Sequence, residues 1–220
     1  YLTKSRYIDG LRCEKKLWLG WHERLGYEEA LPYSILDFGN RVGRGAWALF
    51  PGGVEVTEKP YEHDAAVATT ASLMARDAPA IFEAAFEFEN IRIRVDVLER
   101  LEDGWGLREV KSNKEADAKK YHFDDAAVQL YVLEGCGIKV SSVELIHTNH
   151  VYMRSEGEID WQAMLVRADI ELQTRDLLCK VKETVPRLFS VLAAAEAPYI
   201  YADKTLCKNP YRCDYFDHCM

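Results

Sequence analysis

The stretch FEAAFEFENIRIRVDVLERLEDGWGLREVKS, residues 82 to 112, predicts three short strands joined by two tight turns. From Ile91 to Leu101, apolar and polar residues alternate, which is the pattern of a strand with one buried face. The alternation puts Ile91, Ile93, Val95 and Val97 on one face and Arg92, Arg94 and Asp96 on the other. Glu89-Asn90 and Asp103-Gly104 are typical of turns between neighbouring strands. The stretch therefore predicts an antiparallel meander.

Charged residues occupy adjoining strands of this meander. Glu109 and Lys111 are two residues apart, so their side chains are predicted to point the same way, and Asp96 lies on a strand only about 5 Å away. Two carboxylates and an ammonium group are therefore able to converge. The alternative interpretation is that these are ordinary charges on a solvated face of the sheet.

Composition places the chain among globular proteins. Its 220 residues, 48% hydrophobic and 29% charged, are sufficient for one well-packed domain. No run of about 18 apolar residues is present to span a membrane, and no leader opens the sequence, so we expect a cytoplasmic protein. The net charge of -8 argues against coating nucleic acid by bulk electrostatics but leaves room for a local basic groove.

Periodicity and turn signals divide the single domain into three parts. A helical part is expected over residues 1–78, a sheet core over 80–153, and C-terminal helices with a tail over 158–220. The expected helices run from Ser5 through residue 23, over 36–50, about 61–77, about 121–134, 160 to about 184 with a stop near Pro186, and 188–197. Gly39, Gly43 and Gly45 in the second helix indicate close packing or close approach of a ligand.

The helix expected from about Tyr121 to Glu134 has a polar face. His122, Asp125 and Gln129 recur on it at spacings of three and four residues. A strand over residues 139–153 is predicted to follow the helix and to join the sheet.

Cysteines gather near the two ends of the sequence. The tail CKNPYRCDYFDHC contains Cys207, Cys213 and Cys219, and Cys13 lies far away in sequence. Three cysteines need a fourth ligand for a zinc or iron-sulfur site, and either His218 or Cys13 could supply it. The spacing differs from the C-x2-C pattern of most zinc fingers, and the aromatic neighbours favour iron-sulfur. Zinc and four unrelated thiols remain alternatives.

The other two cysteines lie in apolar helical surroundings. Cys136 and Cys179 are accordingly predicted to be buried small hydrophobic residues.

Taken together, these motifs resemble the PD-(D/E)XK nuclease superfamily over essentially the whole chain. The resemblance rests on Asp96, the Glu109-Val110-Lys111 triplet, a helix carrying Gln129, and the one N-terminal and three C-terminal cysteines. The chain looks most like the RecB-like branch with an iron-sulfur cluster, which includes CRISPR-associated adaptation exonucleases and the nuclease domain of AddB. This resemblance implies a restriction-endonuclease-like α/β core, with a mostly antiparallel or mixed sheet flanked by helices and both termini joined at the cysteine cluster.

The same resemblance implies roles for individual residues. Asp96, Glu109 and the backbone carbonyl of Val110 would bind Mg²⁺ or Mn²⁺, Lys111 would orient water or stabilise charge on phosphate, and Gln129 would support the site. Cys13, Cys207, Cys213 and Cys219 would hold a [4Fe-4S] cluster. Contacts with nucleic acid are expected from Lys114, Lys119, Lys120, His122 and Tyr131.

Two positions depart from the family pattern. The RecB-like branch usually has a metal-binding histidine on an early helix, where this chain has no histidine and the approximate position falls near Gly43. Glu83 is a candidate replacement, because alternation puts it on the same polar face as Glu87. The branch also places a tyrosine four residues after the glutamine, where this chain has Leu133.

The expected function is a divalent-metal-dependent deoxyribonuclease, exonuclease-like, acting on single-stranded or duplex DNA ends. One alternative is a nuclease-fold module that binds nucleic acid or a protein partner with little catalysis. Another makes the cysteines a redox-sensitive clamp of the fold only. Related bacterial proteins carry a further C-terminal region, so an additional domain or partner is a further expectation, and the oligomeric state stays open.

Overall fold

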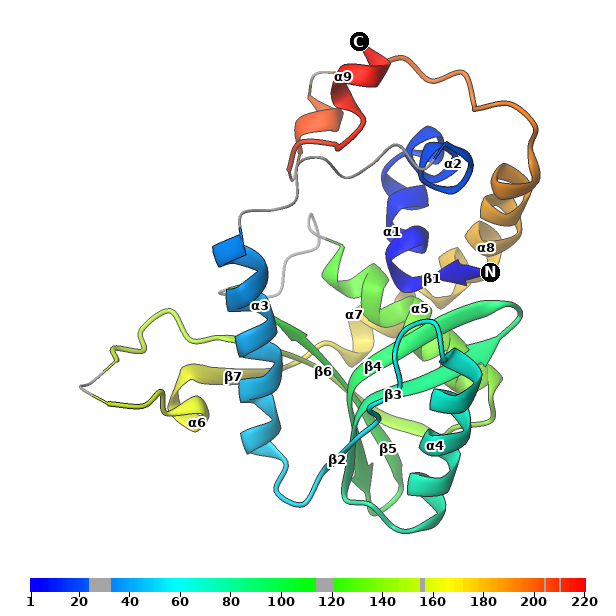
Figure 1. Ribbon diagram of the computed structural model, residues 1–220. Coiled ribbons are helices and arrows are strands. Elements are labelled where there is room, and N and C mark those ends of the chain that lie inside the picture. Colours follow the sequence, from blue (N-terminus) through cyan, green and yellow to red (C-terminus); the bar gives the residue numbers. More distant parts are fainter. Residues whose placement is uncertain (24–32, 114–120, 155–156, 204, 210) are drawn as a thin grey trace.

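The computed structural model describes residues 1–23, 33–113, 121–154, 157–203, 205–209 and 211–220. Its described residues form a seven-stranded mixed sheet in the order β2-β3-β4-β5-β6-β7, with β1 pairing to β4 (Figure 1). The strands are β1 Leu2–Thr3, β2 Val54–Glu55, β3 Ala80–Phe88, β4 Ile91–Leu101, β5 Gly104–Lys111, β6 Val140–Thr148 and β7 Leu165–Asp169. Pairs β1/β4, β2/β3 and β5/β6 are parallel and the others antiparallel. The predicted meander is β3-β4-β5.

Helices cover the sheet, so the expected α/β fold with a mixed sheet flanked by helices is confirmed. The helices are α1 Lys4–Arg12, α2 Glu14–His22, α3 Tyr33–Ala46, α4 His63–Ala75, α5 His122–Gly135, α6 Trp161–Met164, α7 Glu171–Asp176, α8 Leu178–Ala193 and α9 Phe216–Cys219, with short 3-10 turns η1 Trp47–Leu49 and η3 Leu206–Lys208. None of the helices in the described ranges is long and apolar enough to cross a membrane.

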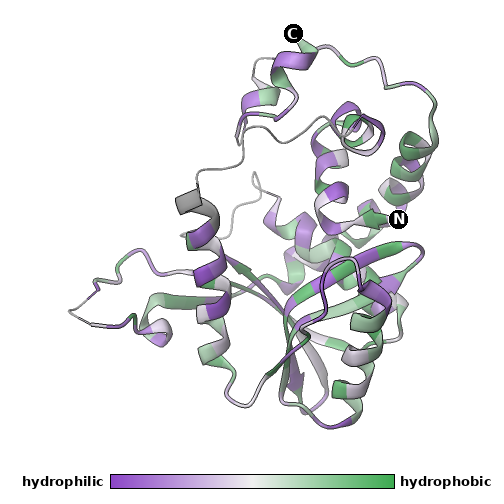
Figure 2. Cartoon of the chain, in the orientation of Figure 1, coloured by the Kyte–Doolittle hydropathy of each residue, from purple (hydrophilic) through white to green (hydrophobic). Residues whose placement is uncertain are grey.

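Two hydrophobic clusters hold the layers together. The larger one packs α4, α5 and α8 against the sheet, and Figure 2 shows hydrophobic residues gathered on the sheet and on helices that pack against it. The smaller one joins α3 to the sheet through Val42, Phe82, Val97 and Ile146. Helix α3 therefore lies over one part of the sheet while α5 packs in the main core.

Strand alternation reverses at one point in β3 and β4. Glu83 has a φ of 57°, the left-handed region that costs a non-glycine residue about 1–3 kcal/mol. Phe82 and Val97 pack in the smaller cluster, whereas Ala84 and Val95 pack in the larger one. The prediction that Val97 shares a face with Val95 is therefore wrong, because the kink at Glu83 reverses the faces of the paired strands.

The N-terminal helix differs from its prediction. The expected single helix is two helices that meet at Cys13, whose backbone is extended. Thr3 caps the first helix in place of Ser5, because its side-chain oxygen accepts a hydrogen bond from the Arg6 amide at 3.2 Å. The break places Cys13 at a corner of the chain.

The long helix predicted from residue 160 is also wrong. Its segment contains α6, strand β7 and α7, because residues 165–169 pair with β6 and Leu165 is buried in the smaller cluster. Tertiary pairing overrides the helical pattern there. Helix α8 instead continues through the exposed Pro186, since Val181, Val185 and Leu188 keep one apolar face buried on both sides of the proline.

Cys136 and Cys179 are both exposed, which contradicts the prediction that they are buried. Cys136 follows α5 and its thiol donates to the Glu87 carbonyl oxygen, and Cys179 lies on the outer side of α8. The apolar neighbours that suggested burial belong to the opposite faces of these helices.

Candidate active site

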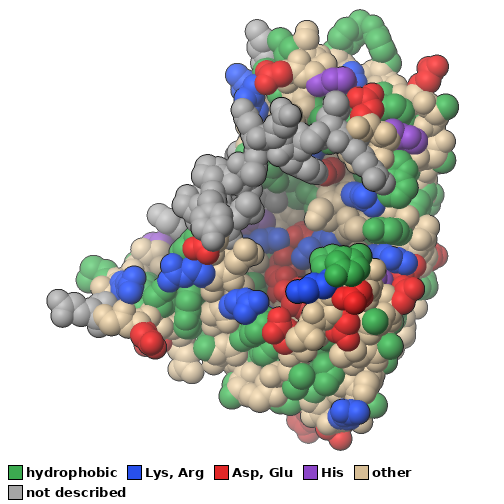
Figure 3. Space-filling view, viewed as in Figure 1, with side chains coloured by type: hydrophobic (Ala, Val, Ile, Leu, Met, Phe, Trp, Pro, Cys, Tyr) green, Lys and Arg blue, Asp and Glu red, His purple; other side chains and the backbone are tan. Residues whose placement is uncertain are grey.

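A pocket of about 470 Å³ opens between α3 and the strands that carry the acidic residues. Gly39, Asn40, Gly43, Arg44 and Trp47 line it from α3 and η1, and Glu55, Glu83, Asp96 and Val110 line it from the strands. Figure 3 shows acidic and basic side chains mixed around a hollow on this face of the molecule. The kink at Glu83 brings this residue to the same pocket as Asp96, on the neighbouring strand.

Asp96 and Glu109 are held by different partners. Asp96 Oδ2 accepts a hydrogen bond of 2.7 Å from the Val110 amide. Glu109 is fully buried, and its two oxygens lie 2.6 Å from Lys111 Nζ and 2.6 Å from Gln129 Nε2, respectively. The structure thus brings the D…ExK residues and Gln129 together on β4, β5 and α5.

Two residues join this group that the sequence did not assign to it. Asp125 Oδ2 lies 2.6 Å from Lys111 Nζ, one helical turn before Gln129 on α5. Lys4 Nζ lies 3.2 Å from both oxygens of Glu109. The spacing of Asp125 to Gln129 was a usable signal, whereas nothing in the local sequence distinguishes Lys4 from the other basic residues around it.

Burial and charge set the protonation of the two central carboxyl groups in opposite directions. Burial, together with the nearby Glu109 carboxylate, raises the pKa of Asp96 to about 7. Burial also disfavours the charged form of Glu109, but the ammonium groups of Lys111 and Lys4 outweigh it and lower the pKa of Glu109 well below its usual range. Glu109 is therefore an anion near neutral pH, whereas burial raises the pKa of Asp96, and also the pKa values of Asp125 and Glu83.

The metal-free protein is expected to lose stability as the pH rises from about 4 to about 7. The folded state binds a proton at Asp96 more tightly than the unfolded state, so the free energy of unfolding falls across this window. The pKa of Glu109 is lowered in the folded state, so the stability that its ionised form contributes is lost only when the pH falls below this window. Urea unfolding in EDTA at a series of pH values measures the slope, and Asp96→Asn is expected to flatten it. An equal slope in both proteins would contradict this assignment.

The oxygen-rich donor set fits a divalent metal ion. Asp125 Oδ1 and Gln129 Oε1 are buried acceptors without a hydrogen-bond partner in the described part of the chain, next to the Glu109 carboxylate. Carboxylate and amide oxygens are the ligands that Mg²⁺ and Mn²⁺ prefer. Over the described ranges, however, no three His, Cys, Asp or Glu side chains are close enough to hold a metal as they stand, and Lys4 and Lys111 lie among the carboxylates.

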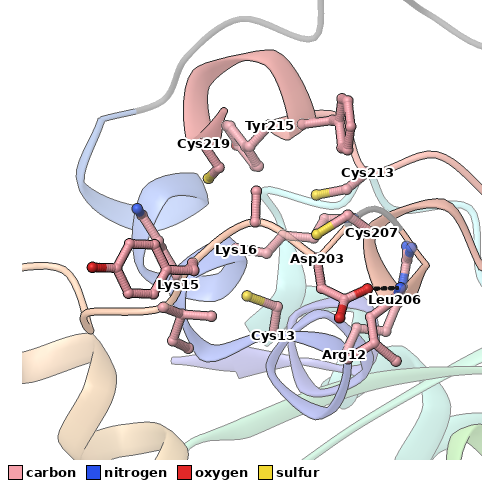
Figure 4. Close-up of a pocket in the computed structure, with 14 residues that line it drawn as sticks. Arg12, Cys13, Lys15, Lys16, Asp203, Leu206, Cys207, Cys213, Tyr215 and Cys219 are labelled. Carbon is pink, nitrogen blue, oxygen red and sulfur yellow. Dashed lines mark hydrogen bonds between the residues drawn. The ribbon is translucent and has the colours of Figure 1, made fainter.

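A second cavity, of about 80 Å³, is lined by Cys13, Cys207, Cys213 and Cys219 (Figure 4). All four are free thiols, and they come from the α1–α2 corner and from the tail. Burial raises the pKa of the Cys213 and Cys219 thiols. Arg12, Lys15 and Lys16 also line the cavity, and the ammonium group of Lys16 is already paired with Asp9 at 2.8 Å and Asp214 at 3.2 Å. The donor type suits an iron-sulfur cluster or zinc, but among the described residues the four thiols are not close enough together to hold a metal as they stand, so the expected cluster joining the two ends is not seen.

The remaining predicted residues lie apart from the central contacts. His122 Nε2 is 2.8 Å from the Asn113 side-chain amide, and Tyr131 donates to Glu89 and packs edge-on against Phe88. Leu133 is fully buried in the main core. Lys114, Lys119 and Lys120 lie outside the described residues.

Comparison with known proteins finds only a distant structural similarity. No protein-family model and no curated protein matches the chain. Among solved structures, the chain is similar to the crystal structure of SSO0001, at 11% sequence identity over 99% of this chain and 85% of that chain, with a TM-score of 0.48. A likeness of this size carries no functional argument.

Proposed function

We propose that this protein is a divalent-metal-dependent nuclease with a restriction-endonuclease-like core, of the PD-(D/E)XK type, that hydrolyses DNA phosphodiester bonds. The observation that carries the proposal is the Glu109–Lys111 contact of 2.6 Å on β5, next to Asp96 on β4 and with Gln129 behind Glu109. Ordinary surface charges on a wetted sheet would not be buried in this way, since burial of unneeded charges is costly.

Each residue has a role that follows from its contacts. Asp96, Glu109 and the Val110 carbonyl would hold Mg²⁺ or Mn²⁺, which when bound supplies an activated water and polarises the phosphate. Gln129 fixes Glu109 through its 2.6 Å hydrogen bond. Lys111 would stabilise charge that develops on the phosphate oxygens, and Asp125 orients its ammonium group. Glu83, at the kink in β3, lines the same pocket as Asp96 and would complete the set of ligands.

The four cysteines would bind a structural [4Fe-4S] cluster, with zinc as the less favoured occupant. The proposal is supported by the shared cavity and by the three basic residues around it. Such a cluster would tie the α1–α2 corner to the tail, and its negative charge would be balanced locally.

The decisive experiment incubates the purified protein with end-labelled single-stranded and blunt duplex DNA. We expect the protein to hydrolyse DNA with Mn²⁺ or Mg²⁺ and to lose this activity in EDTA. If the protein is an exonuclease, its products should become progressively shorter from one end of the DNA. A Lys111→Ala preparation controls for contaminating nucleases. No hydrolysis under any metal condition, or equal hydrolysis by both preparations, would overturn the proposal.

The alternative is a nuclease-fold module that binds DNA or a protein without cleaving it. It is favoured by one observation: in the described part of the chain, no histidine lines the pocket, and glycines stand at the α3 positions that face it. Calorimetric titration with Mn²⁺ distinguishes the two, because the module predicts no specific metal site and the nuclease predicts one.

Gly43→His is expected to tighten Mn²⁺ binding by about tenfold, or ~1.4 kcal/mol. A Cβ at Gly43 would meet no atom within 4 Å, and the residue lines the pocket opposite the strands, so an imidazole has room to reach a metal there. Titration calorimetry measures the change. Arg41→His, at an exposed position of the same helix, is the control and should bind Mn²⁺ as the wild type does. Equal affinity in both variants would show that the α3 side of the pocket does not face the metal.

A further inference from the structure

Lys4 is fixed beside the acidic site by its place in the fold. It is the first residue of α1, and Thr3 before it both caps the helix and pairs with Arg92 of β4. Its ammonium group reaches Glu109, 105 residues away in sequence, and its side chain is 21% exposed. The start of α1 thus holds a largely buried cation against the carboxylates.

The contacts of Lys4 are longer than those of the other donors. Lys4 Nζ bridges both oxygens of Glu109 at 3.2 Å and lies 3.8 Å from Asp125 Oδ1. Each Glu109 oxygen already has a shorter contact of 2.6 Å, one with Lys111 and one with Gln129. Lys4 is therefore the donor that Glu109 holds most loosely.

A divalent ion cannot bind Glu109 while Lys4, Lys111 and Gln129 all keep their contacts with its oxygens. Mg²⁺ and Mn²⁺ bind oxygen at roughly 2.0–2.2 Å, and an ammonium group on the same oxygen would repel the ion strongly at that range. One donor has to withdraw when the ion enters. Asp125 Oδ1, buried and without a hydrogen-bond partner among the described residues, lies 3.8 Å from Lys4 Nζ and can receive its ammonium group.

We propose that Lys4 is a positioning residue that acts as a tethered counter-ion of the metal site. Its ammonium group neutralises Glu109 and Asp125 before a divalent ion binds, and it moves from Glu109 toward Asp125 when the ion enters. The inference rests on the proposed metal-dependent function. It adds that the protein itself carries a competitor for its own metal, which sets the metal concentration at which the site fills.

Lys4→Met tests the proposal, because methionine keeps the length of the side chain and removes the charge. We expect Mn²⁺ to bind Lys4→Met about tenfold more tightly than the wild type, as loss of one close charge pair commonly changes affinity by that much or more. We also expect a lower melting temperature in EDTA and a larger increase on adding Mn²⁺. Lys182→Met, an exposed position on α8, is the matched control and should match the wild type in both measurements.

The outcomes separate this inference from the proposed function. Unchanged or weaker Mn²⁺ binding by Lys4→Met, in a wild type that binds Mn²⁺ and cleaves DNA, overturns the inference and leaves the function standing. Tighter binding by the variant supports the inference even if the wild type proves unable to cleave DNA. Failure of both proteins to bind Mn²⁺ overturns the metal site and the inference together.

A second measurement uses the wild type alone, so it tests the inference even if Lys4→Met does not fold. Brief reductive methylation, read by mass spectrometry, should modify Lys4 more slowly than Lys182 in EDTA. Addition of Mn²⁺ should change the rate at Lys4 and leave the rate at Lys182 unchanged, because the ammonium group exchanges its bridging contact with Glu109 for a contact with Asp125. A Lys4 rate that does not respond to Mn²⁺ overturns the inference.

Discussion

Asp96→Asn is expected to lower Mn²⁺-dependent hydrolysis of DNA by about 10²–10³-fold, the usual effect of removing one electrostatic group from a catalytic centre. Asparagine keeps an oxygen that can accept the 2.7 Å hydrogen bond from the Val110 amide, so the strand geometry should persist. What is lost is the negative charge that would bind the metal. Because that charge is costly in the metal-free site, the variant should be at least as stable as the wild type in EDTA near pH 7.

The experiment compares initial rates on labelled single-stranded DNA at saturating Mn²⁺, together with melting curves in EDTA. Asp176→Asn, at the exposed end of α7, is the matched control and should leave both quantities unchanged. A combination of lost activity and retained stability marks a functional carboxylate. Activity within a few-fold of the wild type would show that Asp96 is not part of the reacting centre.

Cys213→Ser is expected to prevent binding of the proposed cluster and to lower Tm by about 6–12 °C. This corresponds to a loss of ~3 kcal/mol in a chain of this size, within the usual range for loss of a structural metal. Cys213 lines the cavity with three other cysteines, one of which comes from the opposite end of the sequence. A bound group would therefore close a loop of most of the chain, and losing it releases that constraint.

The measurement uses anaerobically purified protein, with iron, sulfide and zinc assays and a melting curve. We expect a brown wild type with iron and sulfide in equal amounts. Cys179→Ser, an exposed thiol on α8, should keep the colour and the Tm. A colourless wild type with stoichiometric zinc would contradict the choice of an iron-sulfur cluster. If the wild type contains no metal, and Cys213→Ser and Cys179→Ser have the same Tm, the four thiols do not form a metal site.

The sheet core was predictable because its signals are local. Alternation over residues 91–101 and the Asp103-Gly104 turn specify neighbouring strands without reference to the rest of the chain. The shared direction of Glu109 and Lys111 followed from their spacing, whereas the place of Gln129 beside them was expected only from the family resemblance. The pairing of β6 with β5 was implied only in part, since sequence does not reveal which edge a later strand joins.

The elements that were missed depend on tertiary contacts. Strand β7 exists because it pairs with β6, and α8 passes Pro186 because its apolar face is buried. The reversal of faces at Glu83 has no signature in an alternating sequence, since a glutamate with positive φ is stabilised by its surroundings. Lys4 was overlooked for the same reason, because its partners lie more than 100 residues away.

The corner at Cys13 has a consequence for the order in which the protein folds. Helix α2, which follows it, packs against α8, and Trp18 donates a hydrogen bond to the Ala194 carbonyl oxygen. The two residues of this hydrogen bond are 176 positions apart in the sequence, so α2 and α8 pack over a long stretch of chain. Contacts of such sequence separation form slowly, whereas β3, β4 and β5 pair between near neighbours. We therefore expect the meander to form first and α2 to dock against α8 late in folding.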